Sequence, residues 1–350
     1  GSSLDSDRLS RRLKKSRRVF ASSRENKLII LTNMSKGKHI AVIGDGTYVV
    51  LTALKKFPVY LSAIVLMADD GGSTGLLRQE FGLLPAGDVR RALTALSNHP
   101  DEFITRLFNY RFSEGSLNGH NFGNFVIAVL ERVCGSFEKA VEAASKLLAV
   151  EKGEVIPVSF DDVRLFAELA DGSVIKGESN IDIPKHNGEI TIEKIWLEPQ
   201  AKANAKALKA IRDAGLIIIG PGDLYTSIIP NFLVKGIVEA LAESRAKKIY
   251  ICNLMTKYGE THGFVAYDFV NVLEKYIGFG VLDAVIINNQ RPPENILGRY
   301  RKEKAFFIDP FFSNPAGAKK PKIIKTNLIS KGDLIRHNKE KLAEIALKFI

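Results

Sequence analysis

The sequence predicts an α/β protein whose mainly parallel β-sheet is covered by helices on both faces and carries a β-rich insertion. Short apolar runs, which are typical of buried parallel strands, alternate with helical segments along most of the chain. Several of these runs end in loops rich in Gly, Asp, Ser, Thr and Asn. Residues from about 155 to 197 instead carry hairpin signals, which predict the insertion.

The first part of the chain contains two predicted buried strands, His39–Ile43 and Leu61–Met67, because each is an apolar run that ends in a polar loop. A short helix from Val49 to Lys56 separates them. Asp88 and Ser136 are suitable helix N-caps. Helices are predicted over 88–97, 101–108, 122–134 and 136–147.

The insertion is recognised by its turn residues. Asp171-Gly172 is a hairpin signal between strands over 165–169 and 173–178, and 190–197 supplies a third strand. The α/β pattern then returns, while Gly317–Lys325 is predicted to be a loop. The later elements are strands over 216–219, 248–252 and 284–288, and helices over 201–213, from Thr226, over 265–277 and over 339–349.

Length and composition exclude several protein classes. The 350 residues fit two domains or one large α/β unit, and 45% hydrophobic with 25% charged residues is ordinary globular composition. No apolar run approaches the roughly 20 residues of a membrane-spanning helix. Cys134 and Cys252 cannot form a disulfide framework or a zinc cage by themselves. We see no secretory h-region with a cleavage site, so a cytoplasmic location is expected.

The net charge of +11 is spread unevenly along the chain. Residues 1–36 contain ten basic and three acidic residues, which accounts for seven of these charges. We expect residues 1–37 to form a basic, flexible arm and 38–350 to form one domain with the insertion. The arm is either simply solvated or touches anionic partners, and RNA or lipid binding by a chain lacking residues 1–33 distinguishes the two. Nucleic-acid binding is the weaker hypothesis, because no RRM, KH or helix-turn-helix signal is present.

The polar loops locate a candidate site, because ligands of parallel sheets bind beyond the carboxyl ends of the strands. The first loop holds Gly44, Gly46 and Thr47, where glycine lets a phosphate approach the backbone at the start of a helix. Asp69 follows 25 residues after Gly44, near the spacing of a ribose-binding acid. A tight structural turn remains the alternative, because Asp45 adds negative charge and a third glycine is missing.

The second loop is the strongest local signal. Asp69 and Asp70 can hold Mg²⁺ or sugar hydroxyls, while Gly71, Gly72 and Ser73 can cradle phosphate. The alternative is an Asx-turn followed by a helix N-cap before Leu76.

Asp88 and two arginines follow this loop at the predicted start of a helix. Asp88 offers an acid there, and the guanidinium groups of Arg90 and Arg91 suit bidentate phosphate recognition. A capped helix with a solvated basic face is the alternative.

Three later segments add polar candidates. His120 is a candidate proton donor or phosphate ligand, with a polar turn as the alternative, and Asn121 and Asn124 are candidates for contacts with a ribose, base or sugar. The Gly220–Ser227 turn fits a second anion site, and its candidate residues are Gly220, Gly222, Asp223, Tyr225, Thr226 and Ser227. Asn253 and Thr256 follow another strand and are expected to line the same cleft. No Ser–His–Asp order, HExxH or Walker A sequence is present, which disfavours hydrolase, metalloprotease and P-loop functions.

Together these loops resemble one family, the YvcK proteins, which are also called gluconeogenesis factors and belong to the superfamily of the 2-phospho-L-lactate transferase CofD. The resemblance extends from about residue 38 to 349. The matching motifs occur in the family's order at 68–75, 84–90, 119–124, 220–227, 252–261 and 334–342.

The resemblance implies a Rossmann-like core with a nucleotide cleft lined by the Asp69-Asp70 loop, the Gly220–Ser227 turn and the Asn253 loop. YvcK proteins are known as cytoplasmic UDP-N-acetylglucosamine binders tied to gluconeogenic growth, cell shape and wall synthesis, without an established reaction. CofD proteins transfer a phospholactyl-type group from a guanosine diphosphate donor to a deazaflavin with Mg²⁺. Relatives tend to dimerise, so a homodimer is expected.

One departure from the family pattern affects the first loop. The family usually reads Gly-Gly-Gly-Thr-Gly, whereas this chain reads Gly44-Asp-Gly-Thr-Tyr48 and reaches its helix about two residues early. Three outcomes stay open for this turn: an altered phosphate site, a weakened one, or one used for a different ligand.

Two functional hypotheses follow. In the first, a UDP-sugar-binding regulator, the Gly44–Thr47 and Gly220–Ser227 turns hold the diphosphate, and Asn253 and Thr256 orient the nucleoside or sugar. Asp69, Asp70 and Asp88 then take sugar hydroxyls or a cation, so Asp70→Asn is expected to weaken binding. In the alternative, a CofD-like transferase, Asp69 and Asp70 hold Mg²⁺. No cofactor beyond Mg²⁺ is implied.

Overall fold

The computed structural model describes residues 38–44, 47–99, 101–313 and 321–350. The expected basic arm over 1–37 and the candidate Gly46 lie outside these residues. Within them, no helix is long and apolar enough to cross a membrane.

Seven parallel strands form the central sheet, in the order β10-β9-β8-β7-β1-β2-β3. The chain moves outward from β1 through β2 to β3, then returns to the other side of β1 at β7 and continues to β10. The strand order therefore reverses between β1 and β7, which is the switch point where such sheets bind ligands. The strands are β1 Lys38–Ile43, β2 Val59–Val65, β3 Gly153–Pro157, β7 Leu216–Ile219, β8 Lys247–Ile251, β9 Ala284–Asn288 and β10 Lys322–Thr326.

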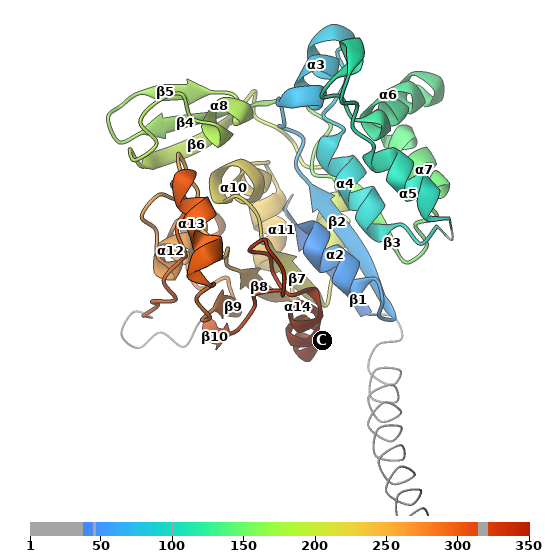
Figure 1. Cartoon of the computed structure of the whole chain (residues 1–350). Helices are drawn as coiled ribbons and strands as arrows, with labels where there is room; N and C mark the ends of the chain where they lie inside the picture. Colours follow the sequence, from blue (N-terminus) through green and yellow to red (C-terminus); the bar gives the residue numbers. More distant parts are fainter. Residues whose placement is uncertain (1–37, 45–46, 100, 314–320) are drawn as a thin grey trace, which may run out of the picture.

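Helices cover both faces of the sheet (Figure 1). Successive residues of a strand point to opposite faces, so Ala41 and Ile43 of β1 belong to one hydrophobic core and Ile40 and Val42 to the other. The first core includes residues of α9 Ala205–Asp213, α11 Ile237–Glu243 and α12 Ala266–Ile277. The second includes residues of α2 Tyr48–Leu54, α4 Gly87–Leu96, α7 Phe137–Leu147 and α14 Lys339–Ala346. The predicted α/β fold class is confirmed.

The remaining helices lie around this framework. Ser136 caps α7 as expected, because its hydroxyl accepts the backbone N–H of Lys139 at 3.3 Å. The helices not yet named are α3 Gly72–Phe81, α5 Glu102–Asn109, α6 Phe122–Cys134, α8 Glu178–Asp182, α10 Ile229–Phe232 and α13 Glu294–Lys302. There is also a π-helical turn at Leu224–Ile228, and there are 3-10 turns at Gly115–Leu117 and Leu347–Phe349.

The β-rich insertion forms a separate antiparallel sheet in the order β5-β4-β6 (Figure 1). Its strands are β4 Arg164–Leu169, β5 Val174–Lys176 and β6 Ile192–Glu198. Alternate residues of β4, such as Leu165 and Leu169, are buried in the core that α11 and α12 share. The insertion was predicted to begin at about residue 155, but these first residues belong to β3, which pairs with β2 as the edge strand of the central sheet.

Three local predictions were wrong. A loop was predicted over Gly317–Lys325, of which residues 317–320 lie outside the described residues. Lys322 instead begins β10, whose two isoleucines among polar residues give a weak pattern that pairing with β9 overrides. Ser73 lies within helix α3, not in a loop, because the helix already begins at Gly72. Asp88 is not an N-cap, since α4 begins one residue earlier, at Gly87.

Gly75 is a position where the fold has no room for a side chain. A Cβ added there would overlap the carbonyl oxygen of Asp70. We expect Gly75→Ala to lower the free energy of unfolding by about 1–3 kcal/mol, because α3 or the Asp69-Asp70 loop must move. Urea unfolding followed by circular dichroism measures the change. Gly298→Ala in α13 is the matched control, because a Cβ there meets open space; equal stability changes would contradict the expectation.

Candidate functional site

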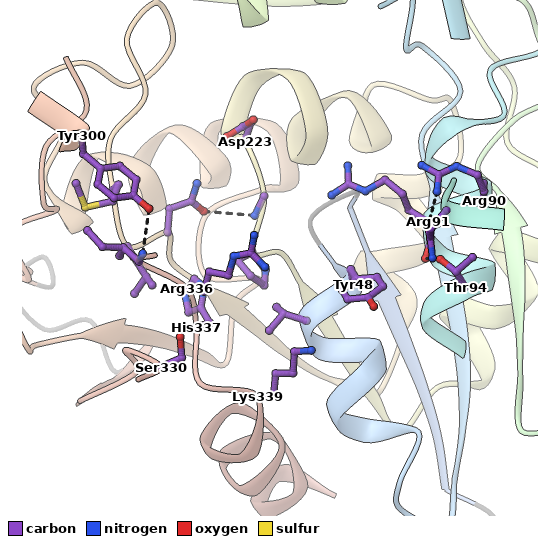
Figure 2. A pocket seen from close by; sticks show the side chains of 18 of the residues that line it. Tyr48, Arg90, Arg91, Thr94, Asp223, Tyr300, Ser330, Arg336, His337 and Lys339 are labelled. Atoms are coloured by element: carbon purple, nitrogen blue, oxygen red, sulfur yellow. Dashed lines mark hydrogen bonds between the residues drawn. The ribbon is translucent and has the colours of Figure 1, made fainter. Parts of the chain in front are cut away.

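A cleft of about 990 Å³ lies beyond the carboxyl ends of the central strands, at the switch point (Figure 2). Its walls come from the starts of α2 and α4, the turns after β7 and β8, and the segment before α14. The lining residues are Tyr48, Val49, Arg90, Arg91, Thr94, Asn109, Arg111, Asn121, Pro221, Gly222, Asp223, Asn253, Leu254, Met255, Tyr300, Ser330, Ile335, Arg336, His337, Lys339 and Glu340.

The two predicted glycine turns meet at the base of this cleft. The backbone N–H of Gly220 donates to the carbonyl of Ile43, the residue before Gly44, at 3.0 Å. Gly44 has φ +117° and Gly220 has φ +72°, so both occupy backbone conformations that favour glycine. The N–H of Gly222 donates to Asn253 Oδ1 at 3.4 Å, and this hydrogen bond connects the turn after β7 to the predicted loop after β8. The loops after β1, β7 and β8 are thus brought together.

Basic side chains dominate the cleft walls. Arg91, Arg111, Arg336 and Lys339 are exposed there, whereas the carboxylates among the described lining residues are Asp223 and Glu340. A cleft with this excess of guanidinium and ammonium groups favours an anionic ligand.

The C-terminal wall contains functional candidates that were missed, and Figure 2 shows them opposite α4. Burial lowers the pKa of His337 to about 4, so its imidazole is neutral at pH 7. Its Nε2 lies 3.1 Å from the carbonyl of Cys252, so Nε2–H donates and Nδ1 is left as an acceptor. The hydroxyl of Tyr300 accepts the N–H of Ile335 at 3.0 Å and holds the segment that carries Arg336. The matching C-terminal motif at 334–342 was the signal that could have identified Arg336 and His337.

Six of the predicted site residues line the cleft: Arg90, Arg91, Asn121, Gly222, Asp223 and Asn253. Arg90 is buried, and its guanidinium donates to Asn124 Oδ1 at 3.0 Å and to Asn109 Oδ1 at 2.7 Å. Its local role is therefore to join α4 to α5 and α6.

Ser73, His120 and Asn124 join helices instead of lining the cleft. The hydroxyl of Ser73 accepts the N–H of Asn121 at 3.2 Å and Asn124 Nδ2–H at 3.4 Å, and it faces His120 Nδ1 at 3.3 Å. This network fixes the start of α6 on α3.

The Asp69-Asp70 loop also lies outside the described cleft lining. Asp69 Oδ1 accepts the N–H of Gly71 at 2.9 Å, and Gly72 begins α3. Asp70 Oδ1 accepts both the backbone N–H of Ser179, at 2.9 Å, and its hydroxyl, at 2.7 Å. Asp70 thus joins the β2–α3 loop to α8 of the insertion.

Carboxylates gather between this loop, α4 and α8. Burial, followed by the charge of Asp69, raises the pKa of Glu178 to about 9. Burial and Asp69 likewise raise the pKa of Asp88 to about 6. Burial also raises the pKa of Asp69. Such mutual repulsion is relieved by a proton or by a cation.

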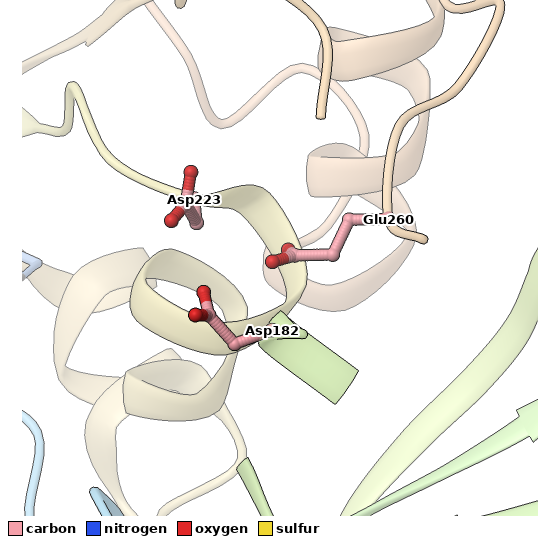
Figure 3. Close-up of side chains that lie close together, drawn as sticks. All are labelled: Asp182, Asp223 and Glu260. Atoms are coloured by element: carbon pink, nitrogen blue, oxygen red, sulfur yellow. The ribbon is translucent and has the colours of Figure 1, made fainter. Parts of the chain in front are cut away.

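A second carboxylate group joins the insertion to the turn after β7 (Figure 3). Oxygen atoms of Asp182, Asp223 and Glu260 lie within 4.8 Å of one another, a geometry that could hold a metal ion. Lys257 Nζ contacts all three, at 2.7 Å from Asp223 Oδ2 and 3.4 Å from Glu260 Oε1, and also pairs with Asp182. Burial and Asp223 raise the pKa of Glu260 to about 7. Lys257 therefore neutralises part of this group.

The other predicted turn residues hold loops in place. Glu260 accepts the N–H of Tyr225 at 3.0 Å and the hydroxyl of Thr226 at 2.9 Å. Thr256 Oγ1 accepts the N–H of Phe306 at 2.9 Å, and the carbonyl of Ser227 accepts Asn231 Nδ2–H at 2.9 Å. Thr47 is buried at the start of α2.

Glu178 gives a prediction about stability and pH. Because its pKa is higher in the folded chain than its usual 4.5, ionisation opposes folding increasingly from about pH 4.5 to pH 9. We expect Glu178→Gln to raise the free energy of unfolding by about 2 kcal/mol at pH 8 and by little at pH 4.5. Thermal unfolding across this range, without divalent cations, measures the difference.

Glu151→Gln, at an exposed carboxylate, is the control for Glu178→Gln. A stability difference that does not change with pH would contradict the proposed cause.

Comparison with known proteins identifies the family. Residues 40–329 match the family described as 2-phospho-L-lactate transferase CofD. The chain is 40% identical to a Bacillus subtilis protein named "Gluconeogenesis factor", over 91% of this chain and 99% of that protein. A Halalkalibacterium halodurans protein of the same name is 39% identical over 89% of this chain and 97% of its own length. A solved Bacillus halodurans structure, described as a UPF0052 family member, superposes with a TM-score of 0.84 at 39% identity, covering 89% of this chain and all of that one. The chain belongs to the CofD family, among its gluconeogenesis factors.

Proposed function

We propose that this chain is a regulatory protein that binds a nucleotide sugar of the UDP-N-acetylglucosamine type and acts in carbon metabolism, cell shape and cell-wall synthesis in the cytoplasm. The observation that carries the proposal is the contact between the two glycine turns below a basic cleft at the switch point. Exposed backbone and nearby cations are what a diphosphate requires.

The diphosphate is assigned to the base of the cleft. Gly222 lines the cleft there, in the turn that is hydrogen-bonded to Ile43, and Arg336 and Lys339 supply positive charge from the C-terminal wall. The guanidinium of Arg336 is exposed and suits a bidentate contact with phosphate oxygens. Tyr48, at the altered first turn, stays beside Lys339, whose Nζ is 5.4 Å from the ring centroid.

The nucleoside or sugar is assigned to the wall beyond β8. Asn253 offers amide donors and an acceptor, and the Nδ1 atom of neutral His337 accepts a hydrogen bond. Met255 and Ile335 supply apolar contact area beside them. A few polar groups within an apolar wall are typical of small-ligand sites.

A binding role agrees with the position of the perturbed carboxylates. Asp69, Asp88 and Glu178, whose pKa values are raised, are not among the described cleft-lining residues. These three carboxylates therefore lie apart from the proposed nucleotide position.

The second candidate is a CofD-like transferase that moves a phospholactyl-type group from a guanosine diphosphate donor. The family match and the carboxylate group around Asp69 and Asp70 favour it. Oxygen ligands suit Mg²⁺, and the raised pKa values of Asp69, Asp88 and Glu178 indicate repulsion that a cation would relieve. A bound Mg²⁺ would neutralise charge on the diphosphate. Turnover of a guanosine diphosphate–lactate donor with Mg²⁺ would replace the regulator proposal.

Calorimetric titration with UDP-N-acetylglucosamine tests the regulator proposal. We expect the full chain to bind this ligand and Arg336→Gln to weaken binding by about 10- to 100-fold, because a charge-assisted contact is worth about 1.5–3 kcal/mol. Arg212→Gln, at an exposed position on α9, is the control and should bind like the unchanged chain. The absence of heat with the unchanged chain at millimolar ligand would reject the proposal.

We also propose the homodimer that the resemblance implies, with α6 as its contact. Val129 and Val133, one turn apart on α6, are 60% and 77% exposed, and Phe103 of neighbouring α5 is 57% exposed. An apolar helix face of this kind suits a two-fold contact with its own copy.

Light scattering after size-exclusion chromatography tests the dimer. We expect a dimer for the unchanged chain and a monomer for Val133→Glu, because the substitution places a charge in the contact. Val174→Glu, at an exposed residue of β5, is the control and should stay dimeric. A monomeric unchanged chain at about 50 μM would contradict the dimer.

A further inference from the structure

Tyr48, the first residue of α2, is 40% exposed and lines the cleft. Figure 2 shows Arg336 on the C-terminal side of the cleft and Arg91 on the α4 side. We use the name α4 compartment for the second side, which is lined by Arg90, Arg91, Thr94, Asn109, Arg111 and Asn121.

Positive charge is concentrated in the α4 compartment. Burial, followed by the charges of Arg91 and Arg111, lowers the pKa of Arg90 to about 10, so both of these guanidinium groups lie close enough to repel that of Arg90. None of the described residues that line this compartment is a carboxylate. Bringing like charges together costs free energy, which a bound anion would recover.

The three arginines differ in how many of their guanidinium N–H groups already donate hydrogen bonds. Arg90 is buried and donates to Asn109 and Asn124, so its position is fixed. The side chain of Arg91 is 50% exposed, and its contact with Asp88 Oδ1 is long, at 3.5 Å. Arg111 is exposed and donates from one guanidinium nitrogen to the carbonyl of Gly119. Arg91 and Arg111 therefore keep N–H donors that can turn toward a ligand.

Polar groups beside the arginines suit an organic ligand. The hydroxyl of Thr94 donates to the carbonyl of Arg91 at 3.0 Å, so its oxygen can still accept a hydrogen bond. Asn121 Oδ1 accepts the N–H of Asn124 at 3.3 Å, which leaves its amide N–H groups as donors. Paired guanidinium groups match the oxygens of a phosphate, and these neighbours match hydroxyl groups.

We propose that the α4 compartment binds the phosphate of a small phosphate monoester, held by Arg91 and Arg111, as a second ligand beside the nucleotide. The inference rests on the proposed function only for the position of the nucleotide on the C-terminal side of the cleft. The cleft has a volume of about 990 Å³ and includes both sides.

Calorimetric titration of the full chain in a phosphate-free buffer tests the α4 compartment. The probes are glucose 6-phosphate, inorganic phosphate and glucose. We expect glucose 6-phosphate to bind and glucose to give no heat. Arg91→Gln and Arg111→Gln should each weaken phosphate-probe binding by about 10-fold or more, because each loses charge-assisted hydrogen bonds. Arg106→Gln on neighbouring α5 is the matched control and should leave probe binding unchanged.

The two phosphate probes distinguish the sources of the anion. Tighter binding of glucose 6-phosphate than of inorganic phosphate supports an organic ligand, and equal binding supports phosphate itself; both support the compartment. No heat from either phosphate probe at 10 mM, roughly the weak limit of a specific site, would overturn it.

A second titration, with UDP-N-acetylglucosamine, separates this inference from the proposed function. Arg91→Gln and Arg111→Gln should change affinity for the nucleotide sugar by less than about 3-fold, which is within 1 kcal/mol. A loss as large as that of the phosphate probes would overturn the inference, because the arginines would then hold the diphosphate. If the unchanged chain fails to bind the nucleotide sugar, the proposed function fails, while the phosphate titration still decides the inference.

Discussion

The reversal of strand order between β1 and β7 is the constraint on which the candidate site depends. Both strands are buried and parallel, so their carboxyl ends leave the sheet at the same edge. The turns that follow must pass close to each other, and the hydrogen bond from Gly220 to Ile43 fixes how close they come. A Cβ at Gly220 would come within 3.2 Å of Ile228 and of the carbonyl oxygen of Ile251, so the close approach of the turns leaves little room for a side chain there. The position of the cleft therefore follows from the sheet topology and does not depend on the identity of the side chains that line it.

Charged contacts then set the position of the insertion against this framework. Asp70 holds Ser179 of α8 from the β2–α3 loop, and Lys257 connects Asp182 of the same helix to Asp223 of the cleft turn. Because Asp223 lines the cleft and Asp182 lies in the insertion, Lys257 links a ligand-facing turn to the small antiparallel sheet. Because Lys257 is partly buried and pairs with both carboxylates, this link favours one placement of the insertion.

The sequence predicts the strands well because burial on both sides of a parallel sheet leaves continuous apolar runs. Leu216–Ile219 and Ala284–Asn288 were predicted at the bounds that the structure has. Edge strand β10 was missed because only two of its residues are apolar and its pairing partner lies far back in the chain. The start of helix α3, Gly72 to Gly75, was predicted as a loop because these residues are poor helix formers.

The site itself was predictable only in part. The loops after β1, β7 and β8 carry their own glycine and asparagine signals, and the structure brings Gly44, Gly220, Gly222 and Asn253 together. Tyr300 carries no local pattern, because its role depends on a contact with Ile335 across 35 residues. Asp70 was predicted to bind a ligand because a carboxylate in a polar loop can do so. In the structure its carboxylate accepts hydrogen bonds from Ser179, and a partner 109 residues away in the chain cannot be recognised from the local sequence.

A crystal structure of the chain with UDP-N-acetylglucosamine tests the assignment of the cleft most directly. We expect the diphosphate to lie over Gly44 and Gly222 at the switch point, with Arg336 contacting it and the α4 compartment free of the nucleotide. A nucleotide bound elsewhere, or a cleft that stays empty at saturating ligand, would contradict the assignment of this edge of the sheet as the binding site.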